Sequence, residues 1–457
     1  MLPAIFDAFV KASPVSVMAR AVMERFLNAE RLDGWFEEVA GTQNLLFSTV
    51  FDLMSQVVCG SHKSVHAAYQ ASTQDIGVSV VAVYDKLKGV DTDTSAAVVR
   101  YAASQARPLM EALGGAHEAL LPGYRVKVLD GNCLAASEHR IKELRGLSSA
   151  PLPGKALVVL DPSLRMPIDG FPCEDAHAQE RALLGGVLET VQGDDLWIAE
   201  RNFCTREFLH GIAKRDGYFV IRQHRGLPLE ILTPQRPLGT TATGKLYEHT
   251  VQMSTQDGAV LPLRRIRVQL KTSTREGERN LYLLTNLPTQ LCATKVAELY
   301  RSRWTIENAF QDLTVHLRCE INTLGYPPAA LLEFCVALVA SITLAVLKAA
   351  LAHVHGARTI HEELSGYYLA DEIGAVHRGM LIAVPAHEWA IFHNMPFAQF
   401  IALLIELAHG VNMRRFKKHP RAPKKKPPPR KNKSDSPHVS TSRLLAMRAS
   451  KGSRSRK

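Results

Sequence analysis

The sequence predicts an α/β protein with an N-terminal helical domain and an all-β insertion in its α/β core. Three observations predict this class. Residues 1–118 space their apolar side chains as helices do, residues 119–224 alternate strand-like and helix-like patterns, and residues 225–290 show strand-like patterns only. We expect residues 291–412 to complete the core with further helices. At 457 residues, the chain is long enough for two or three domains with a sizeable core.

The positive charge of the chain is concentrated at its C-terminal end. Residues 413–457 hold 17 Lys and Arg and one Asp, a net charge of +16 against +11 for the whole chain, which leaves −5 for the rest. This segment is rich in Pro and Ser and poor in apolar residues, so we expect a basic disordered tail. Its charge predicts a salt-dependent attraction to DNA phosphates that has no sequence preference.

Cysteine usage indicates a reducing compartment. The seven cysteines are odd in number, are scattered, and form no Cys-x-x-Cys, which favours free buried thiols over disulfides or a zinc site. The first residues carry neither a basic region nor a long apolar run, so no secretory signal is expected. These features predict a cytoplasmic protein.

One apolar stretch, from Ala329 to Val354, invites comparison with a membrane span. Glu333 and Lys348 leave only 14 uncharged residues between them, fewer than the ~20 that a span needs. We therefore predict a buried helix of the core and no membrane partner.

In residues 119–224, acidic side chains stand at the ends of predicted strands. Strand-like patterns end at Asp130, Asp161 and Ala199, and Glu200 follows the last of these directly. Helix-like patterns alternate with the strands at 173–191 and 206–217. Because the carboxyl ends of strands in an α/β sheet carry its functional groups, we expect the acids to face a site at this edge.

The strand-like segment 225–290 carries a possible basic strip. Arg265 and Arg267 lie on one face of a predicted strand, and Lys271 can continue that face. Such a strip can follow a phosphate backbone. Charges that protect an exposed edge strand from pairing explain the same pattern equally well.

The segment from Lys295 to Arg318 predicts one long amphipathic helix, because it contains no Pro or Gly and is rich in helix formers. Its apolar stripe consists of Leu299, Ile306, Phe310, Leu313 and Leu317. Tyr300, Arg303 and Glu307 lie together on the flank of that stripe, at the border between core and solvent. An ordinary helix with an Arg303–Glu307 ion pair on its wet face is the alternative explanation.

The amino-acid sequence of this segment also resembles that of a known protein family. Tyr300-x-x-Arg303-x-x-x-Glu307, embedded in YRSRWTIENAFQDL, resembles the Tyr-Arg-Glu-Lys signature of bacterial insertion-sequence transposases, of the insertion-sequence-four-like family. The resemblance implies a DDE enzyme with an RNase H-like core. It also implies that Glu307 is the third metal-binding acid, and that Tyr300 and Arg303 contact phosphates of the transposon end.

Two positions depart from that signature. Thr314 stands where the family has Lys; its hydroxyl can bond a phosphate oxygen but carries no charge, and Arg318, one turn further on, can supply the missing cation. Glu200 opens a segment similar to the family's Asp-Arg-x-Phe, so Glu replaces the expected Asp. Its extra methylene displaces the carboxylate, and misplacement of ~1 Å can cost a hundredfold in rate. By the same resemblance, Arg201 is a DNA-binding residue.

Phosphodiester chemistry explains why three acids are expected together. Two cations ~3.5–4 Å apart flank the attacking and leaving oxygens in such reactions, and Mg²⁺ or Mn²⁺ prefers carboxylate oxygens. The predicted catalytic and metal-binding residues are Asp130, Glu200 and Glu307. Together they are expected to bind two Mg²⁺ or Mn²⁺ ions. Asp161 and Asp175 are lesser candidates, since a turn-forming role and a helix N-terminal charge explain them better.

The resemblance implies double-stranded DNA as partner, both element ends and target, with a homodimer assembled on DNA. It implies the bacterial cytoplasm, at the nucleoid, and a DNA-end-binding role for the helical residues 1–118. Two alternatives stay open. One is a catalytically impaired protein that only binds transposon ends, suggested by Glu200 and Thr314. The other is an RNase H-like nuclease without strand transfer.

Overall fold

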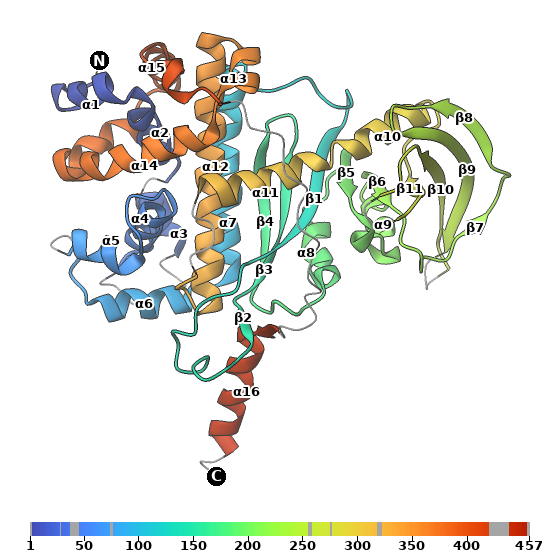
Figure 1. Ribbon diagram of the computed structural model, residues 1–457, viewed down its shortest axis with the longest axis horizontal. Coiled ribbons are helices and arrows are strands. Elements are labelled where there is room, and N and C mark those ends of the chain that lie inside the picture. Colours follow the sequence, from blue (N-terminus) through green and yellow to red (C-terminus); the bar gives the residue numbers. More distant parts are fainter. Residues whose placement is uncertain are drawn as a thin grey trace.

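A ten-stranded sheet runs through the described part of the chain, and helices pack on its faces (Figure 1). The computed structural model describes residues 2–27, 29–36, 45–73, 76–254, 258–274, 277–317, 322–419 and 438–454. The strand order is β4-β3-β1-β5-β6-β11-β10-β9-β7, and β8 pairs with β9. The predicted mixed α/β class is therefore confirmed.

Five strands at one end of the sheet form its mixed portion. They are β1 (Arg125–Cys133), β3 (Lys155–Asp161), β4 (Met166–Cys173), β5 (Asp195–Ala199) and β6 (Tyr218–Arg222). β3 is antiparallel to both β1 and β4, whereas β1, β5 and β6 run parallel to one another. The carboxyl ends of the three parallel strands therefore reach the same edge.

Two features of this portion differ from the prediction. β1 does not break at Gly131 but continues to Cys133, because residues 131–133 pair with β3. β4 was not predicted, since its sequence MPIDGFPC contains Pro, Gly and Asp, which are rare in strands. An edge position tolerates these residues, because an edge strand needs fewer ladder hydrogen bonds.

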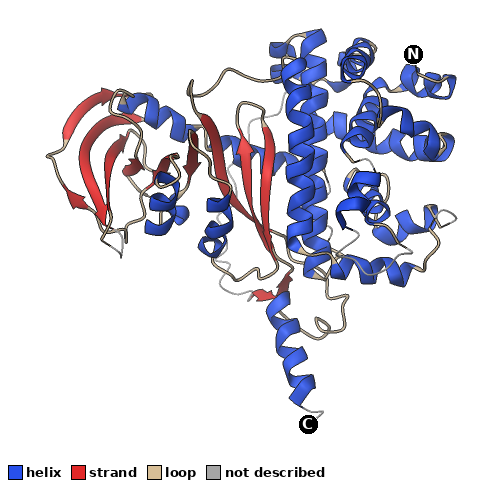
Figure 2. Ribbon diagram, turned by 180° about the vertical axis from the view of Figure 1, so that it is seen from behind, coloured by secondary structure: helices blue, strands red, loops and turns tan. Residues whose placement is uncertain are grey.

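The sheet continues into the segment 225–290 without a gap. Its strands are β7 (Glu230–Ile231), β8 (Arg236–Thr240), β9 (Gly244–Ser254), β10 (Val260–Leu270) and β11 (Asn280–Thr285). β11 pairs antiparallel with β6, so the β-rich segment is joined to the mixed portion by main-chain hydrogen bonds. Figure 2 shows these strongly curved strands at the end of the molecule opposite the helices.

The elements in the described part of residues 1–118 are all helical, as predicted. They are η1 (Ala4–Phe6), α1 (Asp7–Ala12), α2 (Pro14–Phe26), α3 (Ala29–Phe36), α4 (Phe47–Val58), α5 (Val65–Ala71), α6 (Val80–Gly89) and α7 (Thr92–Ala112). Side-chain caps start three of them: Ser64, Ser79 and Asp91 accept a backbone N–H of α5, α6 and α7. The division into domains remains a prediction.

The apolar stretch that the sequence singled out forms α12 (Pro327–His355), the axis of the helical part (Figure 1). By length and composition, α12 could cross a membrane, and η4 with α15 passes the same test only if this bent pair counts as one span. However, 94% of the most apolar window of α12 is buried inside the protein. It packs against α7, α4, α2, α15 and the sheet, which confirms the predicted core helix.

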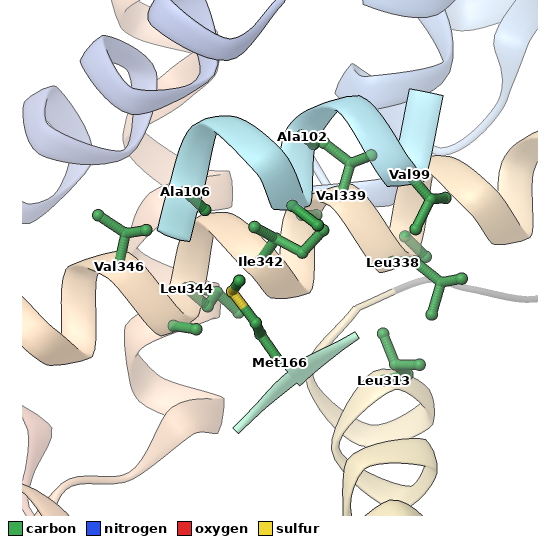
Figure 3. Close-up of a cluster of buried hydrophobic side chains, with 14 of the residues drawn as sticks. Val99, Ala102, Ala106, Met166, Leu313, Leu338, Val339, Ile342, Leu344 and Val346 are labelled. Carbon is green, nitrogen blue, oxygen red and sulfur yellow. The ribbon is translucent and has the colours of Figure 1, made fainter. Parts of the chain in front are cut away.

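Successive side chains of each strand point to opposite faces of the sheet and belong to two separate apolar clusters. Val128 and Ile198 face α12 and α7, whereas Leu129 and Trp197 face α8 (Leu184–Glu189) and α9 (Arg206–Ala213). Figure 3 shows side chains of α7, α12, β4 and α11 meeting in the first cluster, with Leu338 among them. The predicted helix 173–191 is shorter than expected: η2 (Glu180–Leu183) leads directly into α8.

The predicted helix from Lys295 to Arg318 is two helices, α10 (Ala293–Arg301) and α11 (Trp304–His316). They meet at Ser302, whose hydroxyl donates to the Leu299 carbonyl at 2.6 Å. Such local bonds compete with the helical ladder. The apolar stripe is confirmed: Leu299, Ile306, Leu313 and Leu317 are buried, and Phe310 packs against the same cluster.

The end of the chain differs from the predicted disordered tail. β12 (His438–Ser440) pairs in parallel with β2 (Ala150–Leu152), and α16 (Thr441–Arg454) follows. Asp175 explains this docking, because its carboxylate accepts hydrogen bonds from the Ser440 hydroxyl and the Arg443 guanidinium, both at 2.7 Å. Residues 420–437 of the predicted tail lie outside the described residues. The remaining elements are η3 (Arg201–Phe203), α13 (Ala357–Glu363), α14 (Gly366–Ala383), η4 (Ala386–Phe392), α15 (Phe397–His409) and η5 (Met413–Phe416).

Leu338→Ala tests the role of α12. Leu338 is 1% exposed, so truncation should leave a cavity and lower the free energy of unfolding by about 2–5 kcal/mol. Urea denaturation measures this quantity. Ile382→Ala in α14 is the matched control: Ile382 is 81% exposed, so its truncation should change stability by less than about 0.5 kcal/mol. Equal losses in the two variants would contradict the packing described.

Candidate active site

Parallel pairing of β1 and β5 places two of the predicted acids side by side. Leu129 is the register partner of Ala199. Asp130 and Glu200 are the residues that follow these two, so they lie next to each other at the carboxyl edge. The adjacency depends on this register, since slipping one strand by a residue would turn a side chain to the opposite face.

The third predicted acid is joined to the first through an arginine. The Arg303 guanidinium, at the start of α11, donates to the Asp130 carboxylate at 2.8 Å and to the Glu307 carboxylate at 2.6 Å. The two donors are the adjacent nitrogens Nη1 and Nη2. Asp130 and Arg303 are largely buried, whereas Glu307 is half exposed. Two acids 177 positions apart in the chain thus share one cation.

The electrostatics of Asp130 connect all three acids. Burial raises the pKa of Asp130 from its ordinary 3.8 to about 6. Arg303 and the Gly131 N–H, which donates to the carboxylate, oppose this rise. The negative charges of Glu200 and Glu307 add to it. The charges of both other acids therefore act on Asp130, with Arg303 as the compensating cation.

Besides lying at the carboxyl edge of the sheet, Glu200 caps the short helix η3. As N-cap of η3, its carboxylate accepts the backbone N–H of Asn202 at 2.7 Å. This bond holds the carboxylate at the start of η3. Glu200 therefore has one carboxylate oxygen engaged by the main chain directly after β5.

Tyr300 lies on the inner side of the site. Burial raises the pKa of its hydroxyl, and hydrogen bonding to Arg303 together with the charges of Arg303 and Arg222 opposes the rise. The negative charge of Glu200 also raises the pKa of Tyr300, so this phenol lies near the acids. The single helical flank predicted for these residues is interrupted, since Tyr300 lies on α10 and Glu307 on α11. Arg303, between the two helices, still links Tyr300 and Glu307 to Asp130.

The structure gives the remaining predicted site residues partners other than the three acids, or does not describe them. Arg201 pairs with Glu278 at 3.4 Å. Arg318 and the side chain of Thr314 lie outside the described residues. Asp161 holds the turn at Ser163 and pairs with Arg107. Asp175 anchors the C-terminal segment rather than the start of a helix.

A fourth acid, Glu180 of η2, was missed by the sequence analysis. It packs so closely on Gly131 that a Cβ built there would lie 2.3 Å from its Oε1 atom. A larger residue at position 131 would therefore require the Glu180 side chain to move. The Asn202 side-chain amide donates to Glu180, which links Glu180 to the residue that Glu200 caps. No spacing rule in the sequence relates Glu180 to the other acids.

The carboxylate oxygens of the site suit a hard divalent cation. In this structure, Arg303 is bonded to two of the three carboxylates, those of Asp130 and Glu307. Carboxylate oxygens from Asp130, Glu200 and Glu307 are the ligands that Mg²⁺ prefers. Burial is the main cause of the raised pKa of Asp130, and the charges of Glu200 and Glu307 add to it, so a cation beside Asp130 would favour its ionised form. Within the described residues, no three His, Cys, Asp or Glu side chains stand together as a finished metal-binding group.

Comparison with known proteins connects this site to a class of enzyme. Residues 122–342 match the family model described as "Transposase DDE domain", a range that includes Asp130, Glu200 and Glu307. The chain therefore contains a transposase DDE domain, a type of domain that generally uses divalent metal ions.

The comparison with curated proteins found no match. Among solved structures, the chain is similar to the piggyBac transposase in a cryo-EM structure of its synaptic complex with hairpin DNA. The sequence identity is 10%, and the alignment covers 86% of this chain and 85% of that chain with a TM-score of 0.41.

Asp130→Asn tests the electrostatics of the site. The pKa of Asp130 is about 6 in the folded protein against an ordinary 3.8, so its ionisation destabilises the fold as pH rises from about 4 to 6. The variant should gain stability relative to the original chain over that range, by up to about 3 kcal/mol. Urea unfolding at pH 4 and pH 8 measures the difference. Glu362→Gln, in the exposed helix α13, is the control for loss of one carboxylate, and a difference that shrinks as pH rises would contradict the assignment.

Proposed function

We propose that this protein is a transposase that cuts DNA at insertion-sequence ends and transfers the strand to target DNA. One observation carries the proposal. Strand register puts Asp130 beside Glu200, and Arg303 joins Asp130 to Glu307, all within the segment that matches a transposase DDE domain. Acids so placed can serve two-metal phosphodiester chemistry.

The fold proposed for the site is an RNase H-like core. The support is the mixed portion of the sheet, in which the antiparallel strands β4, β3 and β1 are followed by β5 and β6, parallel to β1. The first acid lies on β1 and the second directly after β5, so neighbouring parallel strands supply both. The β-rich segment 225–290, between the second and third acids, corresponds to the proposed insertion.

In this proposal, Asp130, Glu200 and Glu307 hold two Mg²⁺ or Mn²⁺ ions. These ions supply alignment and charge stabilisation for the attacking and leaving oxygens of the phosphodiester. Tyr300 and Arg303 bind phosphates near the scissile bond, for which Arg303 exchanges its carboxylate partners for a phosphate oxygen. Water first nicks the element end, and the freed 3′ hydroxyl then attacks target DNA.

The proposed partners follow from this reaction. The substrate is double-stranded DNA, at the element ends and at the target, and two protomers pair the two ends as a homodimer. The basic residues 413–457 add a charge-driven affinity for DNA. Residues 1–118 help to hold the terminal DNA. The proposed location is the bacterial nucleoid.

A second candidate function is that of a catalytically impaired protein that binds transposon ends and competes with active copies. The observation in its favour is that Glu200 replaces the family's Asp and uses its carboxylate to cap η3. The Thr314 replacement points the same way. A nuclease without strand transfer is the third possibility, and joining of a labelled end to plasmid DNA separates it from a transposase.

A strand-cleavage assay with Mn²⁺ on DNA carrying the element's ends tests the main proposal. Asp130→Asn and Glu307→Gln should each lower the cleavage rate by at least about a hundredfold, since even misplacement of a reacting group by ~1 Å costs this much. A binding assay run in parallel should show that both variants still bind the ends. Glu362→Gln is the control. Binding without cleavage by the original chain would favour the impaired protein instead.

Glu200→Asp tests the departure at the second acid. The shorter side chain restores the family's residue, and we expect a faster strand cleavage by the variant, because its carboxylate moves by about one bond length toward the family's position. The measurement is the single-turnover rate with saturating Mn²⁺. An unchanged rate would show that Glu200 already places its carboxylate correctly.

A further inference from the structure

A cluster of cations lies beside the acid site and is not used by the mechanism proposed above. A cavity of about 320 Å³ is lined by Arg201, His224, Arg225 and Glu278. Arg222, the last residue of β6, reaches the same glutamate. We name these five residues the arginine pocket. They come from η3, from the end of β6 and the loop after it, and from the loop before β11, which pairs with β6 (Figure 1).

One carboxylate organises three guanidinium groups in this pocket. Glu278 Oε1 accepts from Arg225 at 3.1 Å and from Arg201 at 3.4 Å, and Glu278 Oε2 accepts from Arg222. Glu278 and Arg222 are largely buried, whereas Arg225 is 87% exposed. The buried pair thus fixes the pocket, and Arg225 presents its remaining donors to the solvent.

The charges of the pocket do not cancel. Three arginines and one glutamate leave a formal charge of +2. An excess of positive charge in a cavity attracts an anion. Guanidinium groups bind phosphate through paired N–H donors, which makes phosphate the best-matched anion.

The pocket adjoins the acid site on two sides. Arg201 directly follows Glu200, and the charge of Arg222 acts on Tyr300. On the side of the β-rich segment, Gln223 accepts a hydrogen bond from Arg265 of β10 at 2.7 Å. The Arg265 guanidinium lies over the Tyr282 ring. Positive groups therefore continue from the acids across the pocket onto the β-rich segment.

We infer that the arginine pocket binds a backbone phosphate of the DNA strand, next to the phosphate at the acid site and distinct from it. This inference rests on the proposed function, because a strand held at Asp130, Glu200 and Glu307 has to continue past the neighbouring surface. Glu278 preorganises the guanidiniums without neutralising them. The contact positions the strand and reads no sequence, as phosphate contacts do.

Salt-dependent binding of duplex DNA tests the pocket. The probe is a short fluorescein-labelled duplex of arbitrary sequence, and anisotropy gives the binding constant over a series of NaCl concentrations in EDTA. Each phosphate contact contributes about 0.9 to the slope of log K against log salt. Arg225→Ala should reduce that slope by about 1, and Arg225→Lys should retain most of it because the positive charge remains.

Arg358→Ala is the matched control, since Arg358 is also 87% exposed and also pairs with a glutamate, Glu362 of α13. The control should leave the slope unchanged. An unchanged slope in Arg225→Ala, or equal reductions in Arg225→Ala and Arg358→Ala, would overturn the inference. So would an inorganic phosphate site that depends on Arg225 while the duplex slope does not, because the pocket would then take a small free anion.

The outcome also separates this inference from the proposed function. If the original chain binds duplex and cleaves element ends while Arg225→Ala has the original slope, the pocket assignment fails and the transposase proposal stands. If the original chain binds no duplex at all, both fail. Circular dichroism of each variant checks that a lost contact does not come from unfolding.

Discussion

The parallel register between β1 and β5 is the constraint on which the site depends. It sets Leu129 against Ala199, and so brings Asp130 and Glu200 to the same edge of the sheet. The register is held from both faces, since Val128 and Ile198 pack toward α12 while Leu129 and Trp197 pack toward α8 and α9. The geometry of the acids thus depends on apolar packing against both faces of the sheet.

Charge balance is the second constraint, and Arg303 provides it. Ionised Asp130 is costly because it is buried and, to a lesser degree, because Glu200 and Glu307 repel it, as its raised pKa shows. The guanidinium between Asp130 and Glu307 relieves part of this repulsion. The same arginine and Tyr300 are the groups proposed to bind phosphate, so in this proposal one residue has two tasks, one in the free protein and one on DNA.

The local patterns predicted most elements because each depends on nearby residues. The buried stripe of Leu299, Ile306, Leu313 and Leu317 follows from helical spacing, and the strands before Asp161 and Glu200 follow from apolar runs. Prediction failed where distant groups decide. β4 is a strand because β3 lies beside it, and the docking of β12 and α16 depends on Asp175, far away in the chain.

For the candidate site, the sequence by itself determined which residues are candidates: acids at strand ends, and a tyrosine, an arginine and a glutamate within one short segment. These are properties of short segments, set by period and spacing. Only the tertiary structure decided that Arg303 joins Asp130 to Glu307, that Glu180 packs on Gly131, and that three arginines gather around Glu278. These contacts depend on strand register and on the packing of α11 against the sheet, which bring together residues that no local pattern relates.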